Sequence, residues 1–431
     1  MAGLFMYARN VRYSPSMPNR VLGGIVVLLL AGATLGVRGQ APAAGAKNDA
    51  VVAATAGVLT EMSKLRELPV LSPTKSGTQS RQAIEAMVVR ALDAQTTPAQ
   101  MHATELTLKK LGMVGPDFQF RPFVRAILTE QVAGYYDPKT REFYVADWID
   151  LDAQKPVMAH ELTHALQDQH FNLQRMSAWP HGDADAELAA HALVEGDATL
   201  AMAHYAFAHP ELLAALAGSV SGASEELSRA PRSLREGLVF PFDKGMAWVM
   251  RLQQRGGWAA VSAAFSKMPQ SSEQILHPEK YDAYEPPIKV TIPPIEELLG
   301  RGWSRLDEDV QGEWGYYSIL DEFLKAPDVS TAAAAGWGGD RYAVYEGPAS
   351  GDVCVVLLST WDTPADAREF AGAYGRRSAL RYGIPQAPIG PDAWHTKDGD
   401  IAIDQRGSRV AIIEGIPART NAAALMARLW Q

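Results

Sequence analysis

The chain has 431 residues, of which 47% are hydrophobic, and its formal net charge is −9. That length allows a large core divided over two or three domains. Residues 1–41 contain four arginines and no acid, so the remainder has 36 basic against 49 acidic residues, a net of −13, which argues against a nucleic-acid partner. Cys354 is the only cysteine, which excludes an internal disulfide, a cysteine-based zinc site and a lipoprotein cysteine.

The N-terminus is typical of an export signal. A basic stretch extends to Arg20, an apolar run follows at about 21–35, and small residues lie at 39–41. About fifteen apolar residues are short for a membrane-spanning helix. We therefore expect residues 1–41 to be a cleaved signal peptide, with an uncleaved membrane anchor through residues 21–37 as the alternative. Either would place the protein outside the cytoplasm, in the periplasm, in the envelope or secreted.

The segments after the signal are expected to be partly helical. Residues 42–79 are rich in Ala, Pro, Ser and Thr and are predicted to form a linker or loosely docked leader, with one helix at about 49–68. Two amphipathic helices are predicted at 80–92 and 98–111. They begin a domain that we expect to cover residues 80–290.

A β-hairpin is predicted at residues 134–145. Aromatic and β-branched residues flank Asp-Pro-Lys-Thr, a turn with proline at its second position. An extended peptide can add to the edge of such a hairpin as a further strand. Residues 134–137 or 143–145 are therefore candidates for a strand that lines a substrate site. The alternative is an ordinary hairpin that packs its aromatic residues into the core.

The most informative motif is the pentapeptide His-Glu-Leu-Thr-His at 160–164. On a helix, positions four apart lie on the same face, so His160 and His164 can bind one metal ion. Glu161 would then lie beside a zinc-bound water and could act as its general base. A solvated polar face is the alternative. The apolar residues on both sides of the motif favour a buried helix, where unpartnered imidazoles and a carboxylate would cost several kcal/mol.

A catalytic zinc ion usually takes three protein ligands, so a third ligand is expected downstream. Residues 183–198 form an alanine-rich segment that favours helix and can be capped by Asp183 or Asp185. One stripe of this helix carries the polar residues Glu187, His191, Glu195 and Thr199. The first three are candidate ligands. A salt-bridged outer face is the alternative, but the flanking residues are Ala, Leu and Val rather than Lys and Arg.

A His-Glu-x-x-His helix followed by a second helix with Glu-Gly-x-Ala resembles the gluzincins, the zincin-type zinc metallopeptidases whose third ligand is a glutamate. The strings HELTHALQDQHF and EGDA also resemble a group of uncharacterised secreted bacterial metallopeptidases. The resemblance implies a mainly helical zincin-like catalytic domain with a small edge-strand sheet or hairpin over the metal cleft. It also implies Glu195 as the third ligand, with Glu187 as the first alternative and His191 as the second.

The chain departs from many gluzincins at one position. These place an aspartate four residues beyond the ligand glutamate, where it orients a zinc-bound histidine, but this chain has Thr199 there. Histidines that bind a metal nearly always donate their other ring N–H to a partner. We therefore expect Asp197, Asp168 or a backbone carbonyl to orient His160 or His164.

Beyond the second helix, helices are predicted at about 240–254 and 256–268. The polar segment 271–281 follows and recurs in the same bacterial group. A His or Tyr in this region could donate a hydrogen bond to the oxyanion of a tetrahedral intermediate. The candidate donors here are His277 and Tyr281, and the rivals elsewhere in the chain are Tyr205, His204 and Tyr135. For each of them a structural role is the alternative.

The last part of the chain is expected to be a separate domain. Residues 291–341 are predicted to connect it to the rest, and residues 342–431 to form a smaller α+β domain, because short strands alternate with helices there. We find no cluster of candidate ligands in this region, so support or substrate binding is its expected role. The fold class of the whole chain is predicted to be α+β.

These patterns predict an exported zinc metallopeptidase. One Zn²⁺ per chain would be bound by His160, His164 and Glu195, and Glu161 would act as general base in the hydrolysis of a peptide or protein substrate. One alternative is a catalytically silent zincin-fold protein that binds or scaffolds in the cell envelope. Another is a hydrolase of a non-peptide amide or ester. A third is a zymogen in which residues 42–110 cover the cleft.

Overall fold

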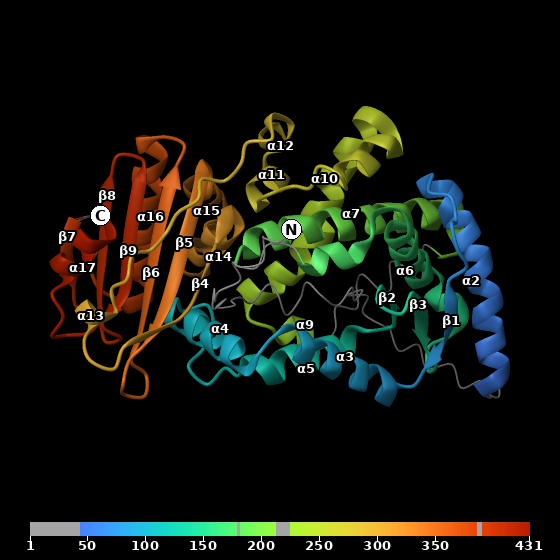
Figure 1. The fold of residues 1–431 in the computed structure, drawn as a ribbon, viewed down its shortest axis with the longest axis horizontal. Helices are drawn as coiled ribbons and strands as arrows, with labels where there is room; N and C mark the ends of the chain where they lie inside the picture. The colour runs from blue at the N-terminus through green and yellow to red at the C-terminus, as the bar shows by residue number, and fades with distance from the viewer. Residues whose placement is uncertain (1–43, 179–181, 213–224, 386–389) are drawn as a thin grey trace, which may run out of the picture.

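Helices surround two separate sheets in this computed structural model, which describes residues 44–178, 182–212, 225–385 and 390–431 (Figure 1). The fold class is α+β, as the sequence predicts. A mainly helical part with a three-stranded sheet lies at one end, and a six-stranded sheet lies at the other. The expected signal or anchor in residues 1–41 lies outside the described residues. Among the described helices, none combines the length and the hydropathy that crossing a membrane requires.

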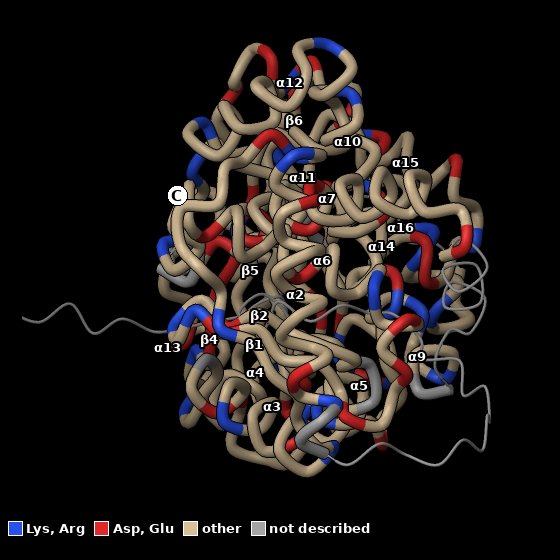
Figure 2. Tube along the Cα trace, turned by 90° about the vertical axis from the view of Figure 1, so that its right-hand side faces the viewer, with Lys and Arg blue, Asp and Glu red and all other residues tan. Residues whose placement is uncertain are grey.

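The segment expected to be a linker is part of the core. Helix α2 (Ala44–Arg66) packs against α6 (Leu151–Phe171), and Figure 2 looks onto this end of the molecule. Val58 and Met62 are buried in the same apolar cluster as the central residues of α6. The structure therefore corrects the expectation of a loosely docked leader at 42–79. Its Ala- and Thr-rich composition conceals an apolar stripe at helical spacing, and that stripe drives the packing.

The predicted hairpin is confirmed, and it gains a third strand. β2 (Gly134–Asp137) pairs antiparallel with β3 (Glu142–Ala146). β1 (Lys75–Gln79) pairs parallel with the other side of β3, so the order is β1-β3-β2. β2 is therefore an edge strand of this sheet, and it lies against α6.

Three helices link this end of the molecule to the other (Figure 1). They are α3 (Arg81–Gln95), α4 (Pro98–Lys110) and α5 (Phe120–Gln131), and the first two confirm the predicted helices. Ser80 caps α3, and Thr97 with Gln100 forms a capping box at the start of α4. These caps satisfy backbone N–H groups that have no partner within the helix, which fixes where each helix begins.

The core of the helical part is built by α6, α7 (Ala184–Ala208) and α10 (Arg232–Ala264). Two helices were expected, one at 240–254 and one from residue 256. In the structure, α10 begins at Arg232 and accommodates Pro241 in its interior. Gly256 and Gly257 kink α10 at the point where the second helix was expected to begin. Gly196 and Gly245 let the backbones of α7 and α10 touch: a Cβ on Gly196 would lie 2.3 Å from a backbone atom of Gly245. The shorter helices nearby are η1 (Leu173–Ala178), α9 (Glu225–Arg229), α11 (Ser272–Leu276) and α12 (Pro278–Ala283).

The C-terminal domain is an antiparallel sheet in the order β4-β5-β6-β9-β8-β7. Its strands are β4 (Ser304–Asp309), β5 (Trp337–Glu346), β6 (Val353–Trp361), β7 (Gly390–Trp394), β8 (Asp400–Arg406) and β9 (Arg409–Ile416). Its helices are α13 (Glu296–Leu299), α14 (Gly312–Leu324), α15 (Pro327–Ala334), α16 (Pro364–Tyr382) and α17 (Ala422–Leu429). One face packs against α14, α15 and α16, and the other against α13 and α17.

The domain boundary is earlier than the sequence indicates. Residues 291–341 were expected to be a connection, but they supply β4, α14 and α15 of the C-terminal domain. β4 has the sequence Ser-Arg-Leu-Asp-Glu-Asp, which lacks the apolar alternation of a typical strand. This segment forms a strand because it pairs with β5. Cys354 lies buried in β6, where burial raises the pKa of its thiol to about 12.

Candidate metal centre

The His-Glu-Leu-Thr-His motif lies in the middle of α6, in the most buried part of the helix. Asp150 caps the start of α6, and Asn172 ends it in a left-handed conformation. His160, Glu161 and His164 each have 0% of their surface exposed. The alternative of a solvated polar face is therefore wrong. A fully buried trio of polar side chains requires partners, and these come from the neighbouring helix and strand.

Helix α7 brings Glu195 onto the two histidines. Glu195 Oε2 lies 3.1 Å from His160 Nε2 and 3.5 Å from His164 Nε2. The two Nε2 atoms are 2.9 Å apart. Within the described ranges, His160, His164 and Glu195 are the only group of three or more His, Cys, Asp or Glu residues whose ligand atoms all lie within 4.8 Å of one another. The three residues that the sequence proposed as ligands therefore converge on one point.

The donor set and its spacing fit a zinc ion. Two imidazole nitrogens and one carboxylate oxygen are the usual ligands of a catalytic zinc, at about 2.0–2.2 Å from the metal, which places the ligand atoms themselves about 3–3.5 Å apart. The distances between Glu195 Oε2 and the two Nε2 atoms lie in this range. Both Nε2 atoms face the same carboxylate oxygen, so a cation there would satisfy all three.

Glu161 lies beside this group, with one oxygen held and one free. Its Oε2 accepts a hydrogen bond of 2.9 Å from the backbone N–H of Tyr136 in β2, while its buried Oε1 has no hydrogen-bond partner among the described residues. Burial raises the pKa of Glu161 to about 8, although the charge of His164 opposes this. The free oxygen is the feature expected of a general base that takes a proton from water.

The metal-free group has an uneven charge distribution. Burial lowers the pKa of His160 to about 4. Burial also acts to lower the pKa of His164, but the Glu195 carboxylate outweighs it and raises that pKa to about 9. For Glu195, burial acts to raise the pKa, but His164 and His160 hold it well below its usual range. Without a metal, a proton on His164 thus balances the negative charge of Glu195.

A glutamine orients His164. His164 Nδ1 donates to Gln167 Oε1 at 2.8 Å, which leaves Nε2 directed at Glu195. The expectation that Asp197 takes this role is met only indirectly, since Asp197 contacts Gln167 rather than a histidine. Asp168 instead accepts a hydrogen bond from the Tyr136 hydroxyl at 2.9 Å.

His160 has a different environment from His164. Its Nδ1 is buried and has no hydrogen-bond partner in the described part of the chain. The ring of Phe242, from α10, is stacked on it with the ring centres 6.2 Å apart. Thr199, which replaces the usual aspartate, also has a buried hydroxyl without a hydrogen-bond partner among these residues. On its Nδ1 side, His160 is therefore held by packing rather than by a hydrogen bond.

The alternative ligands lie elsewhere on α7. Glu187 and His191 are not part of the group that could hold a metal. Glu187 precedes Glu195 by eight residues, which is about 12 Å along a helix. It lies in the first turn of α7, next to the capping residue Asp183. The structure therefore selects Glu195 from the candidates that spacing alone left open.

The candidate oxyanion donors have contacts away from this group. His277 Nε2 lies 2.8 Å from Glu313 Oε1, and the Tyr281 hydroxyl donates to the Lys267 carbonyl at 2.8 Å. Tyr205 packs on His209 at the end of α7. The two remaining candidates contact other residues: the Tyr135 hydroxyl donates to Gln79 Oε1, and the His204 ring packs on Trp258. The structure brings none of these side chains into a contact with the candidate metal ligands that would support the role.

Three contributors were not identified from the sequence. Gln167 follows His164 by three residues, and this helical spacing is the signal that could have found it. Tyr136 lies within the predicted substrate-lining strand, yet its contact with Glu161 depends on the packing of β2 on α6. Phe242 is distant in sequence from the motif, and no local pattern links it to His160.

Comparison with known protein families gives a match that lies outside this site. Residues 297–426 match the model of a family described as a domain of unknown function, DUF8575. The match begins just before β4 and so agrees with the domain boundary in the structure. Neither a curated protein nor a solved structure matches the chain. The metal centre is therefore interpreted from its own residues.

Proposed function

We propose that this protein is a zinc-dependent peptidase that acts outside the cytoplasm, with His160, His164 and Glu195 as zinc ligands and Glu161 as general base. The observation that carries the proposal is the convergence of three buried ligand atoms within 4.8 Å of one another. When Glu161 and Glu195 are both ionised, the proton on His164 balances only one of the two carboxylates. A divalent cation corrects this imbalance.

A bound zinc ion would act as a Lewis acid that lowers the pKa of water and polarises a carbonyl oxygen. Glu161 takes a proton from the attacking water on its free Oε1 and passes it to the leaving amine. The backbone N–H of Tyr136 holds the other oxygen at 2.9 Å and so keeps Oε1 pointed into the site. Because a nearby cation opposes the effect of burial on the pKa of Glu161, this carboxylate is ionised and able to accept the proton in the loaded site.

The position of β2 supports a peptide substrate. The Tyr136 N–H points away from β3 and toward Glu161, so by the alternation of an antiparallel strand the backbone groups of Gly134 lie on the same edge, which pairs with no other strand among the described residues. This edge borders the site, and an extended peptide could pair with it as an additional strand. A non-peptide amide or ester would not use these hydrogen bonds. For this reason we favour a peptidase over a hydrolase of a non-peptide amide or ester.

The silent binding protein is the second candidate. It predicts a bound metal without turnover, or no metal. The complete set of ligands and the free Glu161 Oε1 argue for the active enzyme, because proton transfer from water needs a carboxylate oxygen with no other partner beside the ligand group.

A peptide-library digest tests the proposal. The zinc-loaded full-length protein is compared with E161Q and with the matched control E187Q, which changes a buried glutamate on α7 that is outside the ligand group. We expect E161Q to lower kcat by about 10²–10⁴-fold, the usual contribution of a general base, while its zinc content is unchanged. E187Q should retain the wild-type rate.

Two outcomes would contradict the proposal. No hydrolysis of any peptide by zinc-loaded wild-type protein would favour the binding protein. Hydrolysis by E161Q at the wild-type rate would remove Glu161 from the mechanism.

A further inference from the structure

Arg66, the last residue of α2, is completely buried next to the metal centre. Its Nε lies 2.5 Å from Asp197 Oδ1, and both side chains have no exposed surface. Its Nη1 donates to the Ser262 hydroxyl at 3.1 Å, and its guanidinium lies 4.7 Å from the centre of the Trp258 ring. Arg66 thus joins α2 to α7 and to the second half of α10, across 131 residues of sequence in the case of Asp197.

The other oxygen of Asp197 continues the contact to the metal ligands. Asp197 Oδ2 accepts a hydrogen bond of 2.9 Å from Gln167 Nε2, and the Val194 carbonyl accepts a second one from the same nitrogen at 3.0 Å. With both hydrogens of the amide nitrogen used in this way, Gln167 Oε1 must face His164 Nδ1, which it does at 2.8 Å. The amide orientation decides which ring nitrogen of His164 carries the hydrogen.

We propose that helix α2 is a component of the metal centre, because Arg66 acts through Asp197 and Gln167 to hold His164 with its Nε2 lone pair directed at the metal. The inference rests on the proposed function. Arg66, Asp197 and Gln167 are positioning residues: none of them is a ligand. Partners of this kind typically change metal affinity by about 10–100-fold when they are removed.

This role argues against the alternative in which the N-terminal region makes the protein a zymogen. A zymogen in which residues 42–110 cover the cleft would gain activity when the leader is removed. Since α2 buries Val58 and Met62 in the core and ends in Arg66, its loss should weaken zinc binding instead. Processing that removes α2 would therefore inactivate the enzyme.

The test measures apparent zinc affinity of full-length variants by competition with a chelator, together with the thermal midpoint of the metal-free protein. R66M and Q167L should each weaken zinc binding by about 10–100-fold. R66K retains the charge and should recover most of the affinity. T199A is the matched control, because Thr199 lies on α7 beside the site but its hydroxyl has no hydrogen-bond partner among the described residues. Its zinc affinity should equal that of the wild type.

A double variant separates positioning from stability. Replacing both members of a buried ion pair by apolar residues is often neutral for folding, so R66M/D197L should regain thermal stability lost in R66M while zinc binding stays weak. If R66M does not fold, the zinc affinity of the double variant is measured in its place. Wild-type zinc affinity in R66M or in the double variant would overturn the role of α2 in the metal centre. The proposed peptidase function would still stand. Wild-type protein that binds no zinc would overturn both.

Discussion

Two buried clusters of charged residues lie in the two halves of this molecule, and they differ in how completely the protein satisfies them. In the C-terminal domain, Glu414 of β9 pairs with Arg377 and Arg381 of α16. In the helical part, Glu161 and Glu195 lie beside two histidines. Within the described residues, no arginine or lysine forms an ion pair with either carboxylate. The first cluster has enough positive charge and the second does not.

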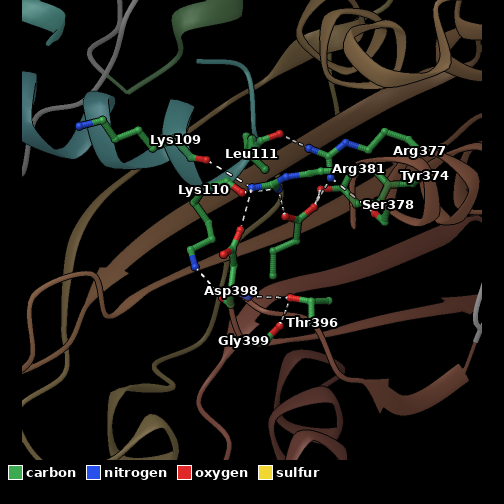
Figure 3. Close-up of polar contacts among 11 residues, drawn as sticks. Lys109, Lys110, Leu111, Tyr374, Arg377, Ser378, Arg381, Thr396, Asp398 and Gly399 are labelled. Atoms are coloured by element: carbon green, nitrogen blue, oxygen red, sulfur yellow. Dashed lines mark hydrogen bonds and ion pairs between the residues drawn. The ribbon is translucent and has the colours of Figure 1, made fainter. Parts of the chain in front are cut away.

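The C-terminal cluster also closes on the backbone of the other domain (Figure 3). Arg377 donates to the Leu111 carbonyl, and Arg381 to the Lys110 carbonyl, just at the end of α4. The carbonyls at a helix C-terminus carry partial negative charge, so the two guanidinium groups are favourably placed there. The Tyr374 hydroxyl adds a hydrogen bond to Glu414. This cluster joins the domains and needs no ligand.

The contrast is the one we expect between a structural cluster and a functional one. Buried polar atoms are nearly always paired, so an unpaired atom is informative. In the metal centre, the unpaired atoms include Glu161 Oε1 and His160 Nδ1. In the C-terminal cluster, both oxygens of Glu414 have partners, and the unpaired atom is a donor, Arg377 Nε. We therefore expect removal of metal to affect the first cluster strongly and the second very little.

Removal of zinc should give the largest effect. Dialysis of the full-length protein against a chelator is expected to abolish hydrolysis, and added zinc should restore it. Zinc at about 100 times its Kd should also stabilise the fold by about 2.7 kcal/mol. Peptide hydrolysis and thermal unfolding before and after dialysis measure the two effects. Undiminished activity in protein without detectable metal would remove the distinction between the clusters.

Breaking the C-terminal cluster should affect stability and leave zinc binding intact. R377M leaves the buried Glu414 with one of its two arginines and should lower the free energy of unfolding by about 3–5 kcal/mol. Denaturant unfolding of the zinc-loaded protein measures it. R376M changes the exposed neighbour and should cost less than about 0.5 kcal/mol. A loss of zinc from folded R377M would show that the two clusters are coupled.

The pH dependence of zinc binding should follow the proton on His164. The pKa of His164 in the metal-free protein is raised from 6.5 to about 9, so its contribution to stability is fully present below about pH 6.5 and lost as the pH rises through 9. Zinc must displace this proton. Apparent zinc affinity should therefore rise by about tenfold per pH unit below pH 9. Affinity that is flat or falls between about pH 6.5 and pH 8 would contradict the assignment of His164 as a ligand.

A hydroxyl outside both clusters should have the smallest effect. Y281F removes one hydrogen bond to the Lys267 carbonyl and should cost about 1 kcal/mol of stability with no change in kcat. Thermal unfolding and steady-state kinetics on the same sample test this. If kcat fell about a hundredfold in a stably folded variant, Tyr281 would regain the role of oxyanion donor that the sequence allowed.

The parts of the site that could be predicted from sequence are those set by helical geometry. His160 and His164 are four residues apart, and their place on one face follows from the period of the helix. Glu195 was selected by resemblance, and the packing of α7 on α6 brings it to the histidines. In contrast, Arg66 and Asp197 are paired by the tertiary fold across 131 residues, and no local pattern could indicate this.

The same distinction applies to the fold. The hairpin of β2 and β3 follows from its turn and its aromatic flanks, and the structure confirms it. β4 was missed because its charged sequence has low strand propensity, and only its pairing with β5 makes it a strand. α2 was read as a leader because composition outweighed the spacing of its apolar residues. Local rules therefore predicted the elements, while long-range packing decided how they join.

The most direct test of the central claim is the zinc content of purified full-length protein, measured by elemental analysis alongside H160A, E195A and E187A. We expect one zinc ion per chain in the wild type and in E187A, and almost none in H160A and E195A, because each of these loses one of the three converging ligand atoms. Zinc that remained at one per chain in both H160A and E195A would contradict the site. So would a wild-type protein that took up no zinc when it was offered.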